Sequence, residues 1–558
     1  MIPRPIEDLL ITVSQQPLVS IAVLVGFWML VMRVKTVRES LSVSLENNGR
    51  AIAGFIALVV LTAFVGFAVW YAEQPGFACE VEPQVATVSC LLQDGEALYH
   101  TTDAAERYSI LYGPSLYLVT GALFKIFGPS IPLAKAGAVF ALIAAMGLIF
   151  TTLLRSVRVN TALVLTSVAA LMLWTTGTSP FVLRPDPFLI FGAALGLFGA
   201  GLKQRRTAVL LVAIAIGFSV NLKIHAGLYM LPVLALLDLR HGWKHVLSAV
   251  GLGTALVMAP FAFHPGIDPF LYSEWSKLSL QHGLQPEVLP LLLRRALFFA
   301  VPMLIPLALG GRLSQRPRLA NQLALAWLTS NLTVIVLATK PGAGLVHLLP
   351  LVPVNIVYCA ILWNSLPNRS TSWSMAPAAW GRGAVAAFLV TVLIFGSVVG
   401  YRSGRRAEAI MVNSEQLCAD ITTILDERGD RTVGMGYGGE GYSFVATYLR
   451  PLLAFAQQPV TIDAISQMDA QLANLEMSPE SMASLDAGVI DVWLIPRDQQ
   501  PFTKRSWYAP HETIFSDDFR AHFLDHYALE GHSEFFDLWT WQGQRQASRS
   551  GRIGPSAP

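Results

Sequence analysis

Charged residues are scarce in this chain. Lysine, arginine, aspartate and glutamate make up 14% of its 558 residues, whereas hydrophobic residues make up 53%. Because soluble domains carry about a quarter charged residues, this composition excludes an ordinary soluble protein and indicates a chain that crosses a membrane many times. The formal net charge is only +2, and no basic tract is interleaved with aromatic residues. The sequence therefore predicts no nucleic-acid partner.

Cysteine is also scarce, and neither internal repeats nor low-complexity segments are found in the sequence. Four cysteines are too few for a fold built on disulfides. Cys79 and Cys90 lie in one polar stretch, however, and could form a disulfide if that stretch faces an oxidising compartment. Such a bridge would hold the stretch between them near the membrane surface.

Long apolar runs, in contrast, are frequent. A membrane-spanning helix needs about 20 mostly apolar residues. Runs of that order lie at residues 17–34, 51–71, 132–154, 161–177, 187–202, 207–221, 224–238, 244–263, 290–310, 319–338, 346–364 and 381–401. We therefore expect an α-helical polytopic membrane protein with about 12 transmembrane helices.

Lysine and arginine in the short loops indicate the orientation of the chain. They gather in every second connection between the apolar runs, at residues 33–50, 155–158, 203–206, 238–244, 311–318 and 369–382. Basic loops face the cytoplasm, so both termini are expected on the periplasmic or outer side of a bacterial inner (plasma) membrane. A further apolar run at 109–130 would reverse this order if it crossed the membrane. We therefore interpret it as an interfacial or re-entrant helix.

Three segments follow from these patterns. Residues 1–50 are expected to hold an extra transmembrane helix and a cytoplasmic basic loop, and residues 51–401 a transmembrane domain with 72–131 as a long first outer loop. Residues 402–558 are polar and alternate helix and strand patterns, so they are predicted to form an extracytoplasmic soluble α/β domain. Its strands are expected at 432–436, 460–463, 489–496 and 535–541.

Ionisable residues that border the apolar runs fall on the expected outer side. Arg184 and Asp186 lie in "RPDP", Lys223 and Lys340 stand between apolar runs, and His347 follows Lys340. Charges near membrane depth are costly and usually mark function, although Arg184 and Asp186 alone fit a loop salt bridge equally well. Arginine and lysine suit a phosphate group. With a carboxylate as general base, the set fits group transfer from a phosphate-bearing lipid.

Four short motifs occur in a characteristic order. They are Glu82-Pro83 followed by Gly95 to Tyr99, "YGPSLYLVTGALFKIFG" (112–128), Arg184-x-Asp186, and "KPGAGLVHLLP" (340–350). Over residues 50–400 this order resembles that of the GT-C superfamily of membrane glycosyltransferases, which includes protein O-mannosyltransferases and the lipid A aminoarabinose transferase. The C-terminal segment resembles that superfamily only in architecture.

The resemblance implies a GT-C-like transmembrane catalytic domain at 51–401 and a polyprenyl-phosphate sugar donor. It implies transfer to a hydroxyl of a glycan, lipid or protein acceptor at the outer face, with inversion at the sugar. It also implies an acidic catalytic residue in the first outer loop. Many relatives carry an aspartate there. This loop offers Glu82, which we favour as the base, and Glu80 as the alternative.

The same resemblance suggests roles for the other ionisable residues. Arg184, Lys223 and Lys340 are expected to bind the donor phosphate, with His347 as a hydrogen-bond donor. Asp186 either orients Arg184 or contributes to acceptor or metal binding. No Cys/His spacing indicates a metal site, so we assign no cofactor and leave a divalent metal open.

A transporter or flippase of a lipid-linked or anionic substrate is the main alternative, because polytopic chains with intramembrane charges often transport. Against it, the charges lie on one side rather than at the midplane, and the chain ends in a sizeable polar domain. A pure scaffold protein would leave the one-sided set of charges unexplained.

Overall fold

The structure is a computed structural model that describes residues 16–31, 49–310, 317–365, 375–439 and 443–543. The predicted basic loop after the first apolar run, and much of the basic stretches at 311–318 and 369–382, lie outside the described residues. The chain divides into two compact units, each built from several stretches of sequence. Unit 1 comprises residues 1–72, 138–259 and 284–407, and unit 2 comprises residues 73–137, 260–283 and 408–558.

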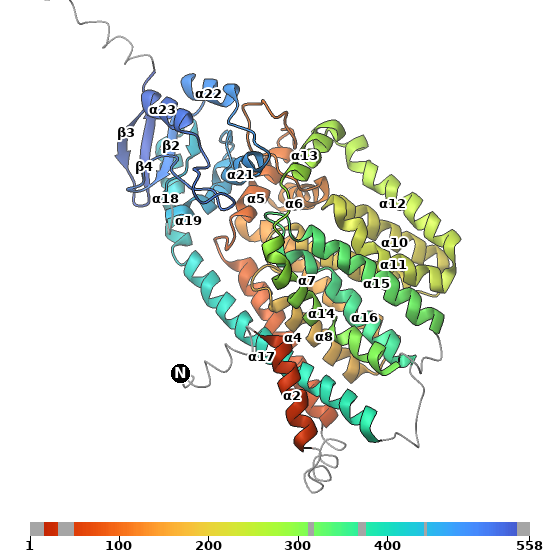
Figure 1. Cartoon of the computed structure of the whole chain (residues 1–558). Coiled ribbons are helices and arrows are strands. Elements are labelled where there is room, and N and C mark those ends of the chain that lie inside the picture. Colours follow the sequence, from red (N-terminus) through yellow and green to blue (C-terminus); the bar gives the residue numbers. More distant parts are fainter. Residues whose placement is uncertain (1–15, 32–48, 311–316, 366–374, 440–442, 544–558) are drawn as a thin grey trace, which may run out of the picture. The chain divides into compact units, whose positions relative to one another are not determined.

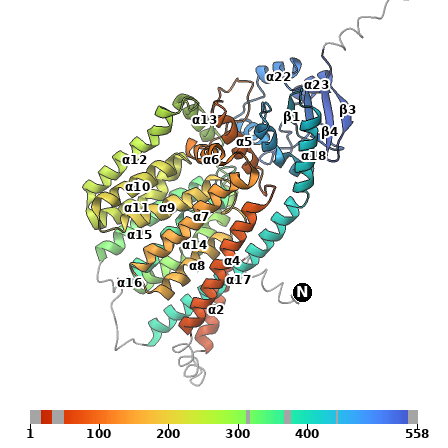
Figure 2. The ribbon, with the colours of Figure 1, turned by 180° about the vertical axis from the view of Figure 1, so that it is seen from behind.

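Helices that belong wholly or mostly to unit 1 lie side by side as a bundle (Figures 1 and 2). In chain order they are α2 (Pro17–Val31), α4 (Gly49–Glu73), α7 (Ile131–Leu154), α8 (Val159–Trp174), α9 (Pro185–Ala200), α10 (Arg205–Val220), α11 (Gly227–His241), α12 (Trp243–Phe263), α14 (Leu289–Gly310), α15 (Pro317–Leu337), α16 (Leu351–Asn364) and α17 (Met375–Met411). Short 3-10 turns also occur at η1 (Ile224–Ala226), η2 (Pro286–Val288) and η3 (Gly344–Leu348). Each apolar run of the sequence corresponds to one of the α-helices.

Many of these helices suit a membrane. Among the described residues, 7 helices are long and apolar enough to cross one, judged by length and composition. They cover Ala51–Glu73, Ile131–Leu154, Trp243–Phe263, Pro286–Ala308, Leu319–Leu337, Gly344–Asn364 and Gly383–Glu427. Shorter apolar helices include Pro17–Leu30, Val159–Trp174 and Pro185–Ala200. The predicted multi-pass integral membrane protein is confirmed, whereas the number and direction of its crossings stay predictions.

Glycines allow α9 and α10 to approach closely. A Cβ atom at Gly192 would lie 2.1 Å from Ser219 Oγ, and one at Gly199 would lie 2.8 Å from Leu211 Cβ. Small residues are the usual means by which membrane helices pack closely. Because α9 and α10 follow each other through a short turn, this packing brings the first turn of α9 next to the segment after α10.

Gly199→Ala should destabilise the protein, although alanine is the better helix former. The added Cβ must push against Leu211 Cβ, and overpacking costs about 1–3 kcal/mol, against about 1 kcal/mol gained in helix propensity. Gly251→Ala in α12 is the matched control, because nothing lies within 4 Å of its added Cβ; it should be neutral or stabilising. Thermal unfolding in detergent measures both variants. Equal unfolding midpoints would contradict the close packing of α9 and α10.

Unit 2 contains most of the predicted first outer loop, residues 260–283 and the C-terminal segment. Its helices are α5 (Val81–Gln93), α6 (Pro114–Phe127), α13 (Pro269–Gln281), α18 (Ser414–Glu427), α19 (Ser443–Ala446), α20 (Pro451–Phe455), α21 (Ala464–Leu472), α22 (Pro479–Asp486) and α23 (Asp517–His526), with the 3-10 turn η4 (Thr447–Leu449). Helix α6 corresponds to the apolar run at 109–130. Its 14 residues are fewer than a straight crossing needs, so its placement at the interface stays a prediction.

A sheet in the C-terminal segment confirms the predicted α/β composition. Its 4 strands lie in the order β1 (Val433–Met435), β2 (Val492–Pro496), β4 (Phe536–Trp541), β3 (Tyr527–His532). Strands β1 and β2 are parallel, and the other two pairs are antiparallel.

Aromatic residues form the core of this domain. Trp493 of β2 is opposite Trp539 of β4. Phe523 of α23 contacts both of these rings, which places α23 against the sheet (Figure 1). Phe502 packs between Trp493 and Phe523.

One strand prediction is wrong and one strand was not predicted. In the stretch 460–463, Ile462 forms only an isolated bridge with Arg107, because Asp463 turns the chain and caps α21 through hydrogen bonds to two backbone N–H groups. Strand β3 was missed because most of its residues are exposed or half-buried, so its sequence carries little apolar signal.

Candidate active site

Arg184, Asp186 and Lys223 meet at the end of unit 1 where α9 begins and α10 ends. Pro185 starts α9 with Arg184 in extended conformation just before it, which places Asp186 in the first turn. Asp186 is 0% exposed. Its Oδ1 lies 3.1 Å from Lys223 Nζ and its Oδ2 lies 3.4 Å from Arg184 Nε. One buried carboxylate thus stands between two cations, and the group keeps a net positive charge.

Two histidines lie beside this group. The rings of His225 in η1 and His347 in η3 are stacked, with centroids 4.8 Å apart, and the hydroxyl of Tyr229 donates to the carbonyl of His347. Nε2 of His225 and Nδ1 of His347 are buried and have no hydrogen-bond partner among the described residues. Buried polar atoms are normally satisfied, so these two nitrogens indicate a place for a polar ligand.

The charge state of His225 follows from its surroundings. Burial, together with the positive charges of Lys223 and Lys340, lowers the pKa of His225 to about 3. The imidazole is therefore neutral near neutral pH, and it can donate one N–H and accept at the other nitrogen. Lys340, which acts on His225 electrostatically, is half-buried in the loop before η3. Gly344, with a φ of 62°, allows that loop to turn.

Five of the predicted site residues thus belong to one part of unit 1. They are Arg184, Asp186, Lys223, Lys340 and His347. The sequence analysis assigned no role to His225. Its position in the sequence, two residues after Lys223, is the feature that could have identified it as a candidate site residue.

Glu80 and Glu82, in contrast, belong to unit 2. Glu82 is 0% exposed, and its Oε2 accepts the backbone N–H groups of Ala78 and Cys79, each at 3.1 Å. The buried Lys135 interacts with its charge. Glu82 therefore fixes the turn that leads into α5. Glu80 is half-buried at the N-cap of α5 and makes no capping hydrogen bond.

A buried ion pair that sequence reasoning missed supports the backbone at Glu80. Arg450 donates from Nε to Asp463 Oδ2 at 2.7 Å, and from Nη2 to the carbonyl of Glu80 at 3.2 Å. Asp463 Oδ1 accepts the N–H groups of Ile465 and Ser466. Arg450 and Asp463 are 4% and 2% exposed, so neither can exchange its partner for water.

Arg450→Met should lower the free energy of unfolding by about 3–5 kcal/mol, because it leaves Asp463 buried without its counter-charge. The double variant Arg450→Met/Asp463→Asn should recover part of that loss, since asparagine still caps α21. Arg428→Met is the control: Arg428 pairs with Glu530 at the surface, where a salt bridge contributes about 0–1 kcal/mol. Denaturant titration followed by tryptophan fluorescence compares the three. Equal losses for Arg450→Met and Arg428→Met would show that burial of the pair has no consequence.

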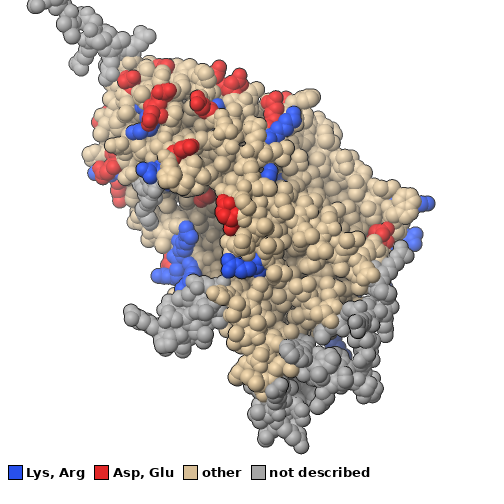
Figure 3. Space-filling model, in the orientation of Figure 1, with Lys and Arg blue, Asp and Glu red and all other residues tan. Residues whose placement is uncertain are grey.

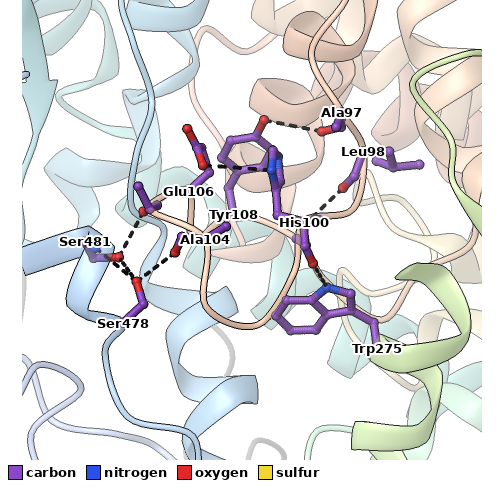
Figure 4. Close-up of polar contacts among 11 residues, drawn as sticks. Ala97, Leu98, His100, Ala104, Glu106, Tyr108, Trp275, Ser478 and Ser481 are labelled. Carbon is purple, nitrogen blue, oxygen red and sulfur yellow. Dashed lines mark hydrogen bonds and ion pairs between the residues drawn. The ribbon is translucent and has the colours of Figure 1, made fainter. Parts of the chain in front are cut away.

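The loop between α5 and α6 is held by polar contacts within unit 2 (Figure 4). Trp275 of α13 donates its ring N–H to the carbonyl of His100 at 2.7 Å. Ser478 and Ser481, at the start of α22, donate to the carbonyls of Ala104 and Ala105 at 2.7 and 2.9 Å. Burial lowers the pKa of His100, whose ring packs edge-on against Tyr108. The predicted first outer loop and the C-terminal segment are therefore parts of one compact unit.

The hypothetical disulfide between Cys79 and Cys90 is not formed in the structure. Cys90 lies in α5, whose rise of 1.5 Å per residue separates it from the start of the helix by about 13 Å. A disulfide needs Cα atoms within about 7 Å. Burial and the neighbouring Asp94 raise the pKa of Cys90 to about 12, so its thiol stays protonated.

Comparisons with known proteins identify the fold. No protein-family model matches the sequence, and no curated protein sequence matches it. The structure of ArnT from Cupriavidus metallidurans bound to undecaprenyl phosphate matches with a TM-score of 0.53 at 13% identity, over 88% of this chain and 98% of that chain. The apo structure of ArnT matches with a TM-score of 0.52 at 14% identity, over the same shares. The chain therefore has the fold of ArnT, a GT-C membrane glycosyltransferase, as the order of its motifs implied.

Proposed function

We propose that this protein is a membrane glycosyltransferase that moves a sugar from a polyprenyl-phosphate donor to a hydroxyl of a glycan, lipid or protein acceptor at the outer face of the membrane. The observation that carries the proposal is the group formed by Arg184, Asp186 and Lys223 beside two histidines with unpartnered ring nitrogens. It occurs in a fold shared with ArnT, whose structure contains undecaprenyl phosphate. The transporter alternative gains no support from these comparisons.

The cationic group suits the phosphate of the donor. Arg184 and Lys223 offer positive charge, and Asp186 fixes the position of both through its two carboxylate oxygens. Lys340 adds a third cation, which acts electrostatically on His225. The N–H groups of His225 and His347 would donate to phosphate oxygens, which removes the cost of their buried, unpartnered nitrogens. Such groups stabilise the charge that grows on a departing phosphate.

Of the two glutamates, we propose Glu80 as the general base. The carboxylate of Glu82 already accepts two backbone N–H groups and interacts with Lys135. Its carboxylate is therefore already engaged in holding the turn before α5. Glu80 is half-buried, makes no capping bond, and its backbone is held by Arg450.

The reaction then follows as a single displacement. The acceptor oxygen bonds to the anomeric carbon, and its proton passes to a carboxylate base. The bond from that carbon to the phosphate oxygen breaks, and its electron pair leaves with the polyprenyl phosphate toward Arg184, Lys223 and Lys340. One displacement inverts the anomeric configuration. Asp186 orients the cations.

A transfer assay with the purified protein in lipid nanodiscs tests this function. The protein is incubated with a panel of polyprenyl-phosphate sugars and a membrane extract as the acceptor source, and release of free polyprenyl phosphate is followed. We expect release with at least one donor, together with a glycosylated product of inverted configuration. Movement of the intact donor between leaflets without release of polyprenyl phosphate would favour the transporter and contradict the proposal.

A further inference from the structure

Asp486, His522 and His526 meet at the surface of unit 2. Asp486 ends α22, and the two histidines are four residues apart on α23, so they share one face of that helix. Nδ1 of His522 lies 3.0 Å and Nδ1 of His526 lies 3.3 Å from the same oxygen of Asp486. The imidazole rings are nearly parallel, with an angle of 11° between them. Among the described residues, this is the one group of His, Cys, Asp and Glu side chains that could hold a metal ion.

We propose that these three side chains bind a zinc ion that links α22 to α23. Zinc with bonds of about 2.0–2.1 Å to nitrogen and oxygen requires ligand atoms about 3.3–3.4 Å apart in a tetrahedron. The two distances from Asp486 are already close to this value. All ligand atoms lie within 4.8 Å of one another, so small side-chain rotations complete three ligand positions. Water would fill the fourth.

The chemistry of the three ligands selects the metal. Imidazole nitrogen suits zinc, copper and nickel, whereas magnesium and calcium prefer oxygen ligands alone. His526 Nδ1 also lies 2.9 Å from the carbonyl of His522, so metal binding through Nδ1 must replace that contact and place the ring proton on Nε2. The three side chains are between 32% and 43% exposed, so hydrated ions can reach them from solvent.

The electrostatic surroundings favour a cation. Helix α23 begins with Asp517 and Asp518, and acidic side chains gather over the C-terminal segment on the face shown in Figure 3. Such a field raises the local concentration of cations. An acidic surface alone would not distinguish one cation from another; the histidine pair supplies the selectivity for zinc over magnesium and calcium.

The metal would act on the loop between α5 and α6. Helix α22 has Asp486 at its C-terminal end, and Ser478 at its N-terminus donates to the carbonyl of Ala104. An ion that joins α22 to α23 therefore also restrains Ser478, and through Ser478 it restrains the loop between α5 and α6. The three ligands take no part in the proposed sugar transfer, so this is a structural site.

Zinc titration of the full-length protein tests the proposal. The protein is purified without a histidine tag, stripped of metal with a chelator, and titrated with Zn²⁺ against a chromophoric competitor. His522→Gln, Asp486→Asn and the double variant His522→Gln/His526→Gln are compared with His532→Gln, an exposed histidine on β3 that lies outside the group. Circular dichroism checks the fold of each variant, and these substitutions at partly or fully exposed positions should leave it unchanged.

The wild type and His532→Gln should each bind one Zn²⁺ that a large excess of Mg²⁺ does not displace. His522→Gln and Asp486→Asn should lower the affinity about tenfold or more, and the double variant should lose this binding event. Zn²⁺ should also slow hydrogen exchange in residues 101–106 of the wild type but not of the double variant. Equal zinc affinity in the wild type and the double variant, or displacement of Zn²⁺ by Mg²⁺, would overturn the proposal.

Discussion

Glu80→Gln should lower turnover by about 10²- to 10⁴-fold, the usual contribution of a general base. Glutamine has nearly the same shape as glutamate but cannot take the proton of the acceptor hydroxyl. The backbone contact from Arg450 to the carbonyl of residue 80 is unaffected by the change, so the protein should fold as the wild type does. Donor binding should change little, because the phosphate is bound by other residues. Steady-state kinetics that separate kcat from KM measure this.

Glu82→Gln is the matched comparison for Glu80→Gln. It removes the negative charge that accepts the N–H groups of Ala78 and Cys79 and that interacts with Lys135. It should therefore lower the unfolding temperature, while the molecules that remain folded keep measurable turnover. The opposite pattern, an inactive but stable Glu82→Gln and an active Glu80→Gln, would return the role of base to Glu82.

Lys223→Met should lower turnover by about a hundredfold or more, because it removes a cation that stabilises the departing phosphate. Lys223 is 6% exposed and lies 3.1 Å from Asp186, so the change also leaves a buried carboxylate with Arg184 alone. Loss of stability and loss of catalysis must therefore be separated. Lys244→Met, the same substitution at an exposed lysine at the start of α12, should leave turnover unchanged.

The double variant Lys223→Met/Asp186→Asn makes that separation. It removes both members of the buried pair, so it should regain much of the stability that Lys223→Met loses. It should not regain turnover, because the phosphate still lacks its cation. Turnover restored to that of the wild type would show that Lys223 and Asp186 form only a structural salt bridge.

The helices could be predicted from the sequence because each depends on local composition. Runs such as 51–71 and 132–154 contain enough apolar residues to fill a membrane, and each became a helix, α4 and α7. Strand β2 could also be predicted, because "VWLIP" is an apolar run. In the structure all of its residues are buried. Strand β3 was not, because its residues are mostly exposed or half-buried, and residues 460–463 were mistaken for a strand because capping of α21 by Asp463 outweighs their strand propensity.

The candidate site could be predicted in its residue types but not in its pairings. Arg184 and Asp186 stand two residues apart, so their contact was expected, whereas the stack of His225 on His347 joins residues that are far apart in the sequence. Glu82 was favoured from its motif, and only the folded turn reveals that its carboxylate accepts two backbone N–H groups. The pairing of Arg450 with Asp463 could not be predicted, because no sequence pattern indicates that these two side chains are in contact.

Binding of undecaprenyl phosphate to the full-length protein, measured by native mass spectrometry from nanodiscs, tests the central claim most directly. The account predicts that one molecule of undecaprenyl phosphate binds, that undecaprenol without the phosphate does not, and that Arg184→Met/Lys223→Met lowers the occupancy about tenfold or more. Equal binding of undecaprenol and undecaprenyl phosphate, or full occupancy in the double variant, would contradict it.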